Sequence, residues 1–266
     1  MEDSQILLLT SLLHVWSLGC YASGILVAIV LLLKDRSELL KWAVYPVSLG
    51  FAGQFMLLMV RWYGSGHLPV TGLFETQHFL ALWVVAAALY FYRRYCAWTL
   101  LPSAVGLALG ALAFASMGPR RLVPLTPAID TPLFLLHVAT SFSAYGLFGV
   151  GAIASLYQIF GFEATNTCKG RRIIDECLYI GYILFSGCMI AGSLWAYLSW
   201  GSYWTWKIKG LWSYLLWFYY SGVLHVRNRS GWQGRPVSLL AVLGFVLVVF
   251  TYLGLGLLFE TSHPLL

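Results

Sequence analysis

Residues 5–33 read QILLLTSLLHVWSLGCYASGILVAIVLLL, a stretch that contains no Asp, Glu, Lys or Arg. A helix needs about 20 predominantly apolar residues to cross the hydrocarbon core of a bilayer, so this stretch is long enough to span it. A strand of a transmembrane barrel would instead alternate apolar and polar residues, and this stretch does not. It therefore predicts a membrane-spanning helix.

Further apolar runs of the same kind lie near 40–61, 77–92, 97–117, 132–160, 175–199, 211–226 and 237–259. Of the 266 residues, 60% are hydrophobic and only 10% are charged, whereas a soluble domain carries about 25% charged residues. Lipid must replace water around much of the chain, and helices satisfy their own backbone groups there. We predict an all-α, polytopic membrane helix bundle with about eight transmembrane helices, in which residues 1–266 form a single domain.

The basic residues predict the orientation of the bundle. In an eight-span arrangement, eleven of the 16 Lys and Arg residues fall in the connections on one side and five in those on the other. Basic residues near span ends concentrate on the cytoplasmic side, so both termini are predicted to face the outer, periplasmic side. The net charge of +6 is therefore a topology signal. It indicates no nucleic-acid partner, because no basic stripe is interleaved with exposed aromatics on a soluble surface.

The predicted outer loop near 195–217 is the most aromatic part of the chain. It reads WAYLSWGSYWTWKIKGLWSYLLW and holds six of the 12 tryptophans. A belt of tryptophans at the membrane–water interface accounts for a few of them. Trp200, Trp204 and Trp206, close together in the sequence, equally suit a platform on which a flat, hydrophobic ligand stacks. The residues alone leave both interpretations open.

Three of the six histidines lie at the ends of predicted spans. His137 lies near the outer end of the fifth span and His263 just beyond the outer end of the eighth, so that they flank the tryptophan-rich loop. His225 lies at the inner end of the seventh span. Ionisable residues in spans point to function by default, and imidazole is the common axial ligand of haem iron. For each of these three taken alone, a hydrogen bond to a neighbour is the favoured interpretation, and it is favoured more strongly for His14, His67 and His78.

Residues 200–206, WGSYWTW, resemble the tryptophan-rich signature W-G-x-x-W-x-W-D of haem-handling proteins in the CcsA/ResC, CcmC and CcmF families of cytochrome c assembly. Other segments are similar to CcsA in particular and follow the family order over nearly the whole chain: GHLPVTGLFE at 66–75, His137-Val138 with SAY at 143–145, LHVR at 224–227, and FTYLG at 250–254 with Ser262-His263. The chain departs from the signature at Lys207 and Gly210, where the family has Asp and Glu.

The resemblance implies haem handling in cytochrome c biogenesis. With a CcsB-type partner, such a protein translocates haem b as cargo and presents it for covalent attachment to C-x-x-C-H apocytochrome c, as a subunit of a system II holocytochrome c synthase. It favours a bacterial inner membrane over a plastid thylakoid membrane. The resemblance places axial ligands of haem iron at His137, His263 and His225, and the aromatic platform at Trp200, Gly201, Trp204 and Trp206.

Two other functions stay open. A HemX-like membrane haem-binding regulator or assembly factor, without synthase activity, is slightly favoured by Lys207 and Gly210. A secondary transporter without haem would need a charged residue at mid-membrane, and the sequence shows no clear one. Lys207 and Lys209 could instead pair with the haem propionates, because ammonium groups hydrogen-bond carboxylates.

Overall fold

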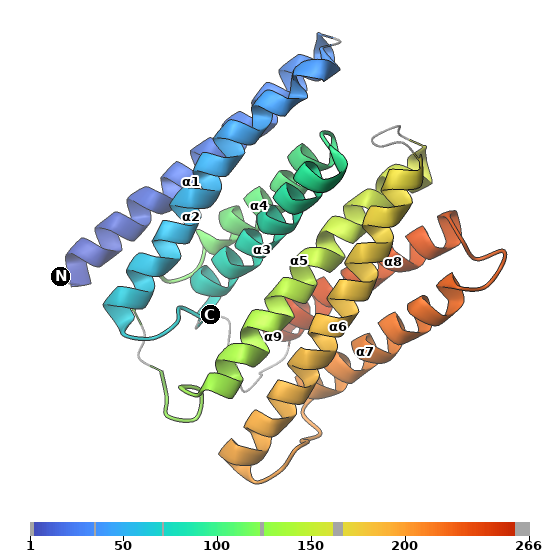
Figure 1. The fold of residues 1–266 in the computed structure, drawn as a ribbon. Helices are drawn as coiled ribbons and strands as arrows, with labels where there is room; N and C mark the ends of the chain where they lie inside the picture. The colour runs from blue at the N-terminus through green and yellow to red at the C-terminus, as the bar shows by residue number, and fades with distance from the viewer. Residues whose placement is uncertain (1–2, 35, 71, 123–124, 162–166, 259–266) are drawn as a thin grey trace. The chain divides into compact units, whose positions relative to one another are not determined.

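A computed structural model of the chain describes residues 3–34, 36–70, 72–122, 125–161 and 167–258. All regular secondary structure in these ranges is helical, and six of the helices are long and apolar enough to cross a membrane (Figure 1). One further apolar helix, Leu100–Ala115, is shorter. The predicted all-α, multi-pass membrane bundle is confirmed, whereas the count of eight spans and the outward termini stay predictions.

The chain forms two compact units, one within residues 1–125 and the other within residues 126–265. The single domain predicted over residues 1–266 stays a prediction. The first unit contains α1 (Asp3–Leu33), η1 (Ser37–Ala43), α2 (Val44–Ser65), α3 (Gly72–Tyr95) and α4 (Leu100–Ala115). Within it α1 runs along α2 and α3 runs along α4, while α1 also packs on α4.

Glycines on α2 let α1 approach closely. A Cβ added to Gly50 would lie 2.7 Å from the ring of Tyr21, and one added to Gly64 would lie 2.5 Å from Ile6. These two pairs show that α1 and α2 are antiparallel, because the later residue of α1 meets the earlier residue of α2. Small residues at such contacts favour helix association in lipid, where apolar burial alone gives little driving force.

The second unit contains α5 (Pro132–Phe160), α6 (Thr167–Trp200), α7 (Ile208–Arg227), α8 (Arg235–Val249), η2 (Phe250–Gly254) and α9 (Leu255–Leu258). Helix α5 packs along α6 and on α8, and α7 lies against α6 and α8 (Figure 1). Phe148 of α5 stacks on Tyr220 of α7 with ring centroids 3.7 Å apart. This buried aromatic pair joins α7 to the α5–α6 pair that carries His137 and the first tryptophans.

Helix α8 continues into η2, a π-helical turn, and then into α9. Phe250 opens this turn, and its ring meets Trp212 of α7 with centroids 4.8 Å apart. A π-turn holds one more residue than an α-turn, and such turns often lie near functional sites. Through this ring contact, the π-turn after α8 packs against α7, the helix that follows the tryptophan-rich connection.

Candidate functional site

The start of α5 positions His137. Thr131 is extended at the N-cap, and its hydroxyl accepts a hydrogen bond from the backbone nitrogen of Phe134 at 3.3 Å. Pro132 occupies the first helical position, where its fixed φ is compatible with the helix and its missing N–H has no helical partner to lose. His137 consequently lies in the second turn of α5, where its ring contacts α6.

The imidazole of His137 is half-buried and held against α6. Its Nδ1 lies 2.9 Å from the backbone oxygen of Cys188 and 3.2 Å from the sulfur of the same residue. A carbonyl oxygen can only accept, so Nδ1 carries the proton and donates it. Nε2 then keeps its lone pair, and a ring oriented by a backbone carbonyl in this way is typical of metal-binding histidines. The chemistry of His137 therefore fits an axial ligand.

Aromatic rings continue from His137 along α6. Trp195 lies nearly parallel to the imidazole, with centroids 6.3 Å apart at 18°, and Trp200 meets Trp195 at 4.8 Å and 65°. Trp195 is buried and its Nε1 donates to the backbone oxygen of Ala128 at 2.6 Å, whereas Trp200 is 45% exposed. The Nζ of Lys207 lies 5.1 Å from the Trp200 ring centroid, in a cation–π contact. The structure thus connects His137 to Trp200 through Trp195.

Trp204 and Trp206 belong to a second aromatic group. Helix α6 ends before Gly201, whose φ of +71° is a conformation that glycine adopts without a Cβ clash. The ring of Trp204 then packs edge-on against Tyr214 of α7 at 4.1 Å, and Trp206 meets Trp204 at 5.9 Å and 83°. Trp206 is 83% exposed. The predicted platform residues therefore lie in two aromatic groups, one on α6 and one between α6 and α7.

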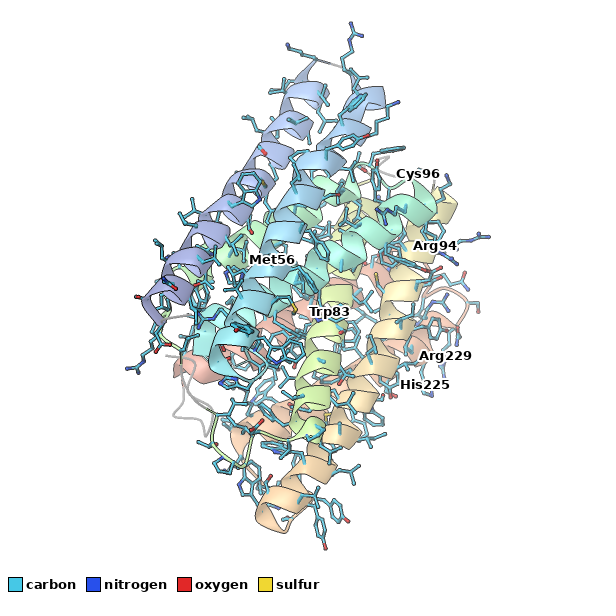
Figure 2. The ribbon with its side chains drawn as sticks, turned by 60° about the vertical axis from the view of Figure 1, so that its left-hand side comes forward. Met56, Trp83, Arg94, Cys96, His225 and Arg229 are labelled. Atoms are coloured by element: carbon cyan, nitrogen blue, oxygen red, sulfur yellow. The ribbon has the colours of Figure 1, made fainter. Side chains whose placement is uncertain are left out.

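His225 lies at the opposite end of α7, where Figure 2 shows it near Arg229. Its Nδ1 is 2.9 Å from the backbone oxygen of Ser221, so Nδ1 donates here as well and the exposed ring keeps a free Nε2. The rise of an α-helix places His225 about 25 Å along the axis from the first residue of α7. His263 lies outside the described residues, so its place beside His137 stays a prediction.

The sequence did not indicate which face of α6 contacts His137 of α5. Cys188, Gly192 and Trp195 follow one another at spacings of four and three, so they share a face of α6. A Cβ on Gly192 would lie 2.6 Å from Nδ1 of His137. Only a glycine there lets the imidazole reach the carbonyl of Cys188. The spacing of a small residue between Cys188 and Trp195 was the sequence signal that could have revealed this contact.

Gly192→Ala is expected to displace the ring of His137 while leaving every predicted iron ligand in the chain. Overpacking of this kind costs about 1–3 kcal/mol of stability, and loss of an orienting hydrogen bond lowers metal affinity about 10–100-fold. Haem content per purified protein, read from the Soret absorbance, should fall accordingly. Gly187→Ala is the matched control, because nothing lies within 4 Å of a Cβ there. Equal haem content in the two variants would contradict the role of this contact.

The first unit buries a separate histidine pair. Nδ1 of His14 lies 2.9 Å from Nε2 of His78, and Nε2 of His14 lies 2.8 Å from the hydroxyl of Ser116. Both imidazoles are buried, and the ring of Phe74 packs on each of them. These hydrogen bonds satisfy both ring nitrogens of His14 and Nε2 of His78, whereas Nδ1 of His78 is buried without a hydrogen-bond partner among the described residues.

Comparison with known proteins places the chain in a family. The family model described as cytochrome C assembly protein matches residues 70–263. The cytochrome c biogenesis protein CcsA of Synechococcus sp. (strain CC9605) is 29% identical over 263 residues, which cover 85% of this chain and 86% of the relative. CcsA of Chlamydomonas reinhardtii is 31% identical over 231 residues, which cover 78% of this chain and 64% of the relative.

The matched region includes α3 and every element that follows it, and therefore includes His137, the tryptophan-rich connection and His225. This multi-pass membrane chain belongs to the cytochrome c assembly protein family.

Proposed function

We propose that this chain handles haem in cytochrome c biogenesis and presents haem b, as cargo, to apocytochrome c on the outer side of the membrane. The observation that carries the proposal is the orientation of His137, whose Nδ1 donates to the carbonyl of Cys188 and whose Nε2 keeps its lone pair. Trp195 and Trp200 supply aromatic surface beside this nitrogen. The relatives named CcsA support the pathway, and a CcsB-type protein is the proposed partner.

In this mechanism His137 and His263 would be the two protein residues that hold the iron of the cargo. Two nitrogen ligands leave no open position for oxygen, so the cargo is protected until apocytochrome c docks. The histidine of the C-x-x-C-H motif then replaces one ligand, and His137 or His263 is released. Each cysteine thiol adds across one vinyl double bond: the sulfur bonds to one vinyl carbon and the thiol proton ends on the other. The addition consumes no oxidant or reductant.

His225 is the proposed contact of the cargo on the inner side. Its exposed ring presents Nε2 at the end of α7 that lies far from Lys207. One haem cannot contact both ends of a 20-residue helix. We therefore propose that His225 and His137 contact haem at two separate sites. We place the protein in a bacterial inner membrane, with the thylakoid membrane as the alternative that the cyanobacterial and algal relatives leave open.

The lysines near the outer aromatic groups suit the haem propionates. Lys207 lies over the exposed ring of Trp200. Burial lowers the pKa of Lys209, in the first turn of α7. A propionate near either ammonium group would form a charge-assisted hydrogen bond and favour the charged lysine. The replacement of the acidic signature residue by Lys207 is thereby compatible with haem binding.

A HemX-like regulator or assembly factor without synthase activity is the second candidate. The departure from the family signature at Lys207 favours it, because a cation lies over Trp200 where the synthase signature has an acidic residue. This candidate also binds haem but does not attach it. The two functions therefore differ in covalent attachment and not in the absorption spectrum.

Lys207→Asp is expected to raise the free energy of unfolding by about 1 kcal/mol. Lys207 is the N-cap of α7, extended at φ −70° and ψ 142°, and its side chain makes no capping hydrogen bond. An Asp there would accept from the first-turn N–H groups and complement the helix dipole. Lys207→Ala removes the cation without adding a cap and is the matched control. Equal stability of the two variants, measured by SDS titration in mixed micelles, would count against the cap.

The function is tested on the detergent-purified chain co-expressed with a CcsB-type partner. We expect a Soret band and, after dithionite, the sharp α and β bands of a six-coordinate haem. The same pair of proteins is then expressed with a C-x-x-C-H reporter in a host that lacks its own cytochrome c assembly pathway. Covalent haem on the reporter supports the synthase subunit, and a haem-bound protein without attachment supports the HemX-like candidate. A colourless protein under haem-replete expression would refute both.

A further inference from the structure

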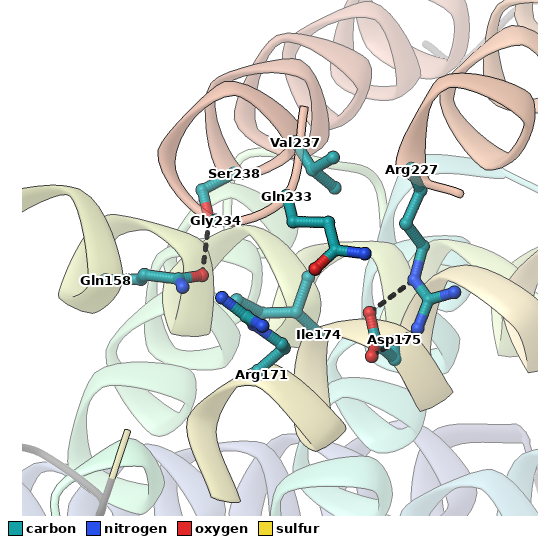
Figure 3. A pocket seen from close by; sticks show the side chains of 9 residues that line it. All are labelled: Gln158, Arg171, Ile174, Asp175, Arg227, Gln233, Gly234, Val237 and Ser238. Atoms are coloured by element: carbon teal, nitrogen blue, oxygen red, sulfur yellow. Dashed lines mark hydrogen bonds and ion pairs between the residues drawn. The ribbon is translucent and has the colours of Figure 1, made fainter. Parts of the chain in front are cut away.

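The second unit carries a small polar pocket where α5, α6, α7 and α8 come together at the end opposite to the tryptophan-rich connection (Figure 3). Its volume is about 100 Å³. A single water needs about 10–15 Å³ of such space, so this pocket holds a group larger than one water. None of the predicted haem-site residues lines it.

Two pairs of pocket residues are already bonded to each other. Nε of Arg227 donates to Oδ1 of Asp175 at 2.6 Å, and this carboxylate raises the pKa of Arg227. The buried hydroxyl of Ser238 donates to Oε1 of Gln158 at 2.7 Å. Figure 3 shows both pairs on opposite sides of the cavity. Asp175, the only carboxylate among the lining residues, and the amide oxygen of Gln158 are therefore occupied, while Nε2 of Gln158 makes no hydrogen bond to a described residue. Gln233 adds a second amide to the lining.

Arg171 adds a charge that these pairs do not balance. Within the described ranges of the chain, no carboxylate pairs with its guanidinium. A Cβ on Gly234 would lie 3.7 Å from Nη2 of Arg171 and 4.0 Å from Nε2 of Gln158, so the two donors converge on this glycine. Gly234 is also the N-cap of α8, where no side chain caps the first turn. The positive end of the helix dipole adds to the same donor-rich space.

We propose that this pocket binds one oxyanion group, the headgroup phosphate of an anionic membrane lipid. Two guanidinium groups and one carboxylate line the pocket, and Arg171 is exposed to solvent, so the lining carries a net positive charge at an accessible site. A lipid is the favoured source because the pocket lies at the ends of membrane-crossing helices and Trp232, nearby in the α7–α8 connection, is 45% exposed. Exposed tryptophans anchor at the membrane–water interface, and basic pockets between helix ends bind anionic headgroups.

The proposal is tested on the full chain in detergent by native mass spectrometry. Phosphatidylglycerol and phosphatidylcholine with identical acyl chains are titrated separately, and bound lipid is counted. We expect preferential binding of phosphatidylglycerol, and about tenfold weaker binding after Arg171→Gln, because a guanidinium–phosphate hydrogen bond is charge-assisted. Arg172→Gln removes the neighbouring exposed charge, which does not line the pocket, and is the matched control with unchanged binding.

A second variant distinguishes loss of the phosphate site from a general loss of structure. Gln158→Glu keeps an oxygen for the Ser238 hydroxyl but places a carboxylate beside Arg171, so it should prevent phosphate binding in a folded protein. Equal lipid binding by the Arg171 and Arg172 variants would overturn the proposal, as would full binding by the Gln158 variant. Inorganic phosphate is the second source of the same chemistry. If it displaces phosphatidylglycerol at equal concentration, the pocket is a site for the free anion and the lipid assignment fails.

Discussion

His137→Ala is expected to remove the outer haem and to lower cytochrome c maturation by at least about a hundredfold. Loss of a group that merely orients a metal ligand already lowers affinity about 10–100-fold, so loss of the ligand itself has a larger effect. The cavity left beside Trp195 adds a stability loss of about 1–3 kcal/mol. The measurement is the Soret absorbance of the purified complex together with covalent haem on a C-x-x-C-H reporter.

His67→Ala is the matched control, since the predicted first outer loop carries this histidine and its Nδ1 already contacts the backbone oxygen of Leu68 at 3.1 Å. It should leave both readouts unchanged. His225→Ala is expected to lower the amount of haem that reaches the outer site. The absorption spectrum of the haem that does reach it should stay unchanged. Wild-type maturation in the His137 variant would remove His137 from the mechanism.

Glu75→Leu is expected to lower the free energy of unfolding by about 3–5 kcal/mol, because it leaves the buried charge of Arg61 without its partner. Nε and Nη2 of Arg61 donate to the same oxygen of Glu75 at 2.9 and 2.8 Å. Both side chains are almost completely buried. Nη1 of Arg61 also donates to the backbone oxygen of Arg120 at 2.9 Å, so the pair connects α2, α3 and the segment after α4. SDS titration in mixed micelles measures the change.

The double variant Arg61→Leu/Glu75→Leu separates the charge from the contact. Replacing a buried ion pair by apolar residues is often neutral, so the double variant should regain most of the stability that the single variant loses. A double variant less stable than Glu75→Leu would show that the hydrogen bonds of Arg61 to backbone carbonyls dominate.

The apolar runs predicted where helices cross the membrane but not where they end. The run 132–160 coincides with α5, because Pro132 and the Thr131 cap lie at the boundary of the apolar stretch. The run 175–199 begins eight residues after the start of α6, since the first turns of that helix carry Lys169 and Arg171 and continue beyond the apolar part. Hydropathy reports the surroundings of a helix, whereas backbone hydrogen bonds determine its length.

The resemblance supplied the predicted ligands, and these stay predictions, whereas the contacts that orient His137 came only from the structure. The resemblance indicated His137 and Trp200, yet their connection depends on Trp195, a buried residue that looks like any interfacial tryptophan in the sequence. The approach of His137 to Cys188 across Gly192 is a contact between two helices. The same holds for His14 and His78, which are 64 positions apart. Such pairs follow from helix packing, which a single sequence does not specify.

The π-turn at Phe250–Gly254 changes the angular register of the chain's last described helix. Each residue of an α-helix advances about 100° around the axis, and the π-turn inserts one residue more than the α-helical ladder holds. A helical wheel drawn from α8 therefore misassigns the faces of Leu255–Leu258 by about 100°. Deleting one residue of this turn would restore the α-helical phase and rotate Leu255–Leu258 about the helix axis.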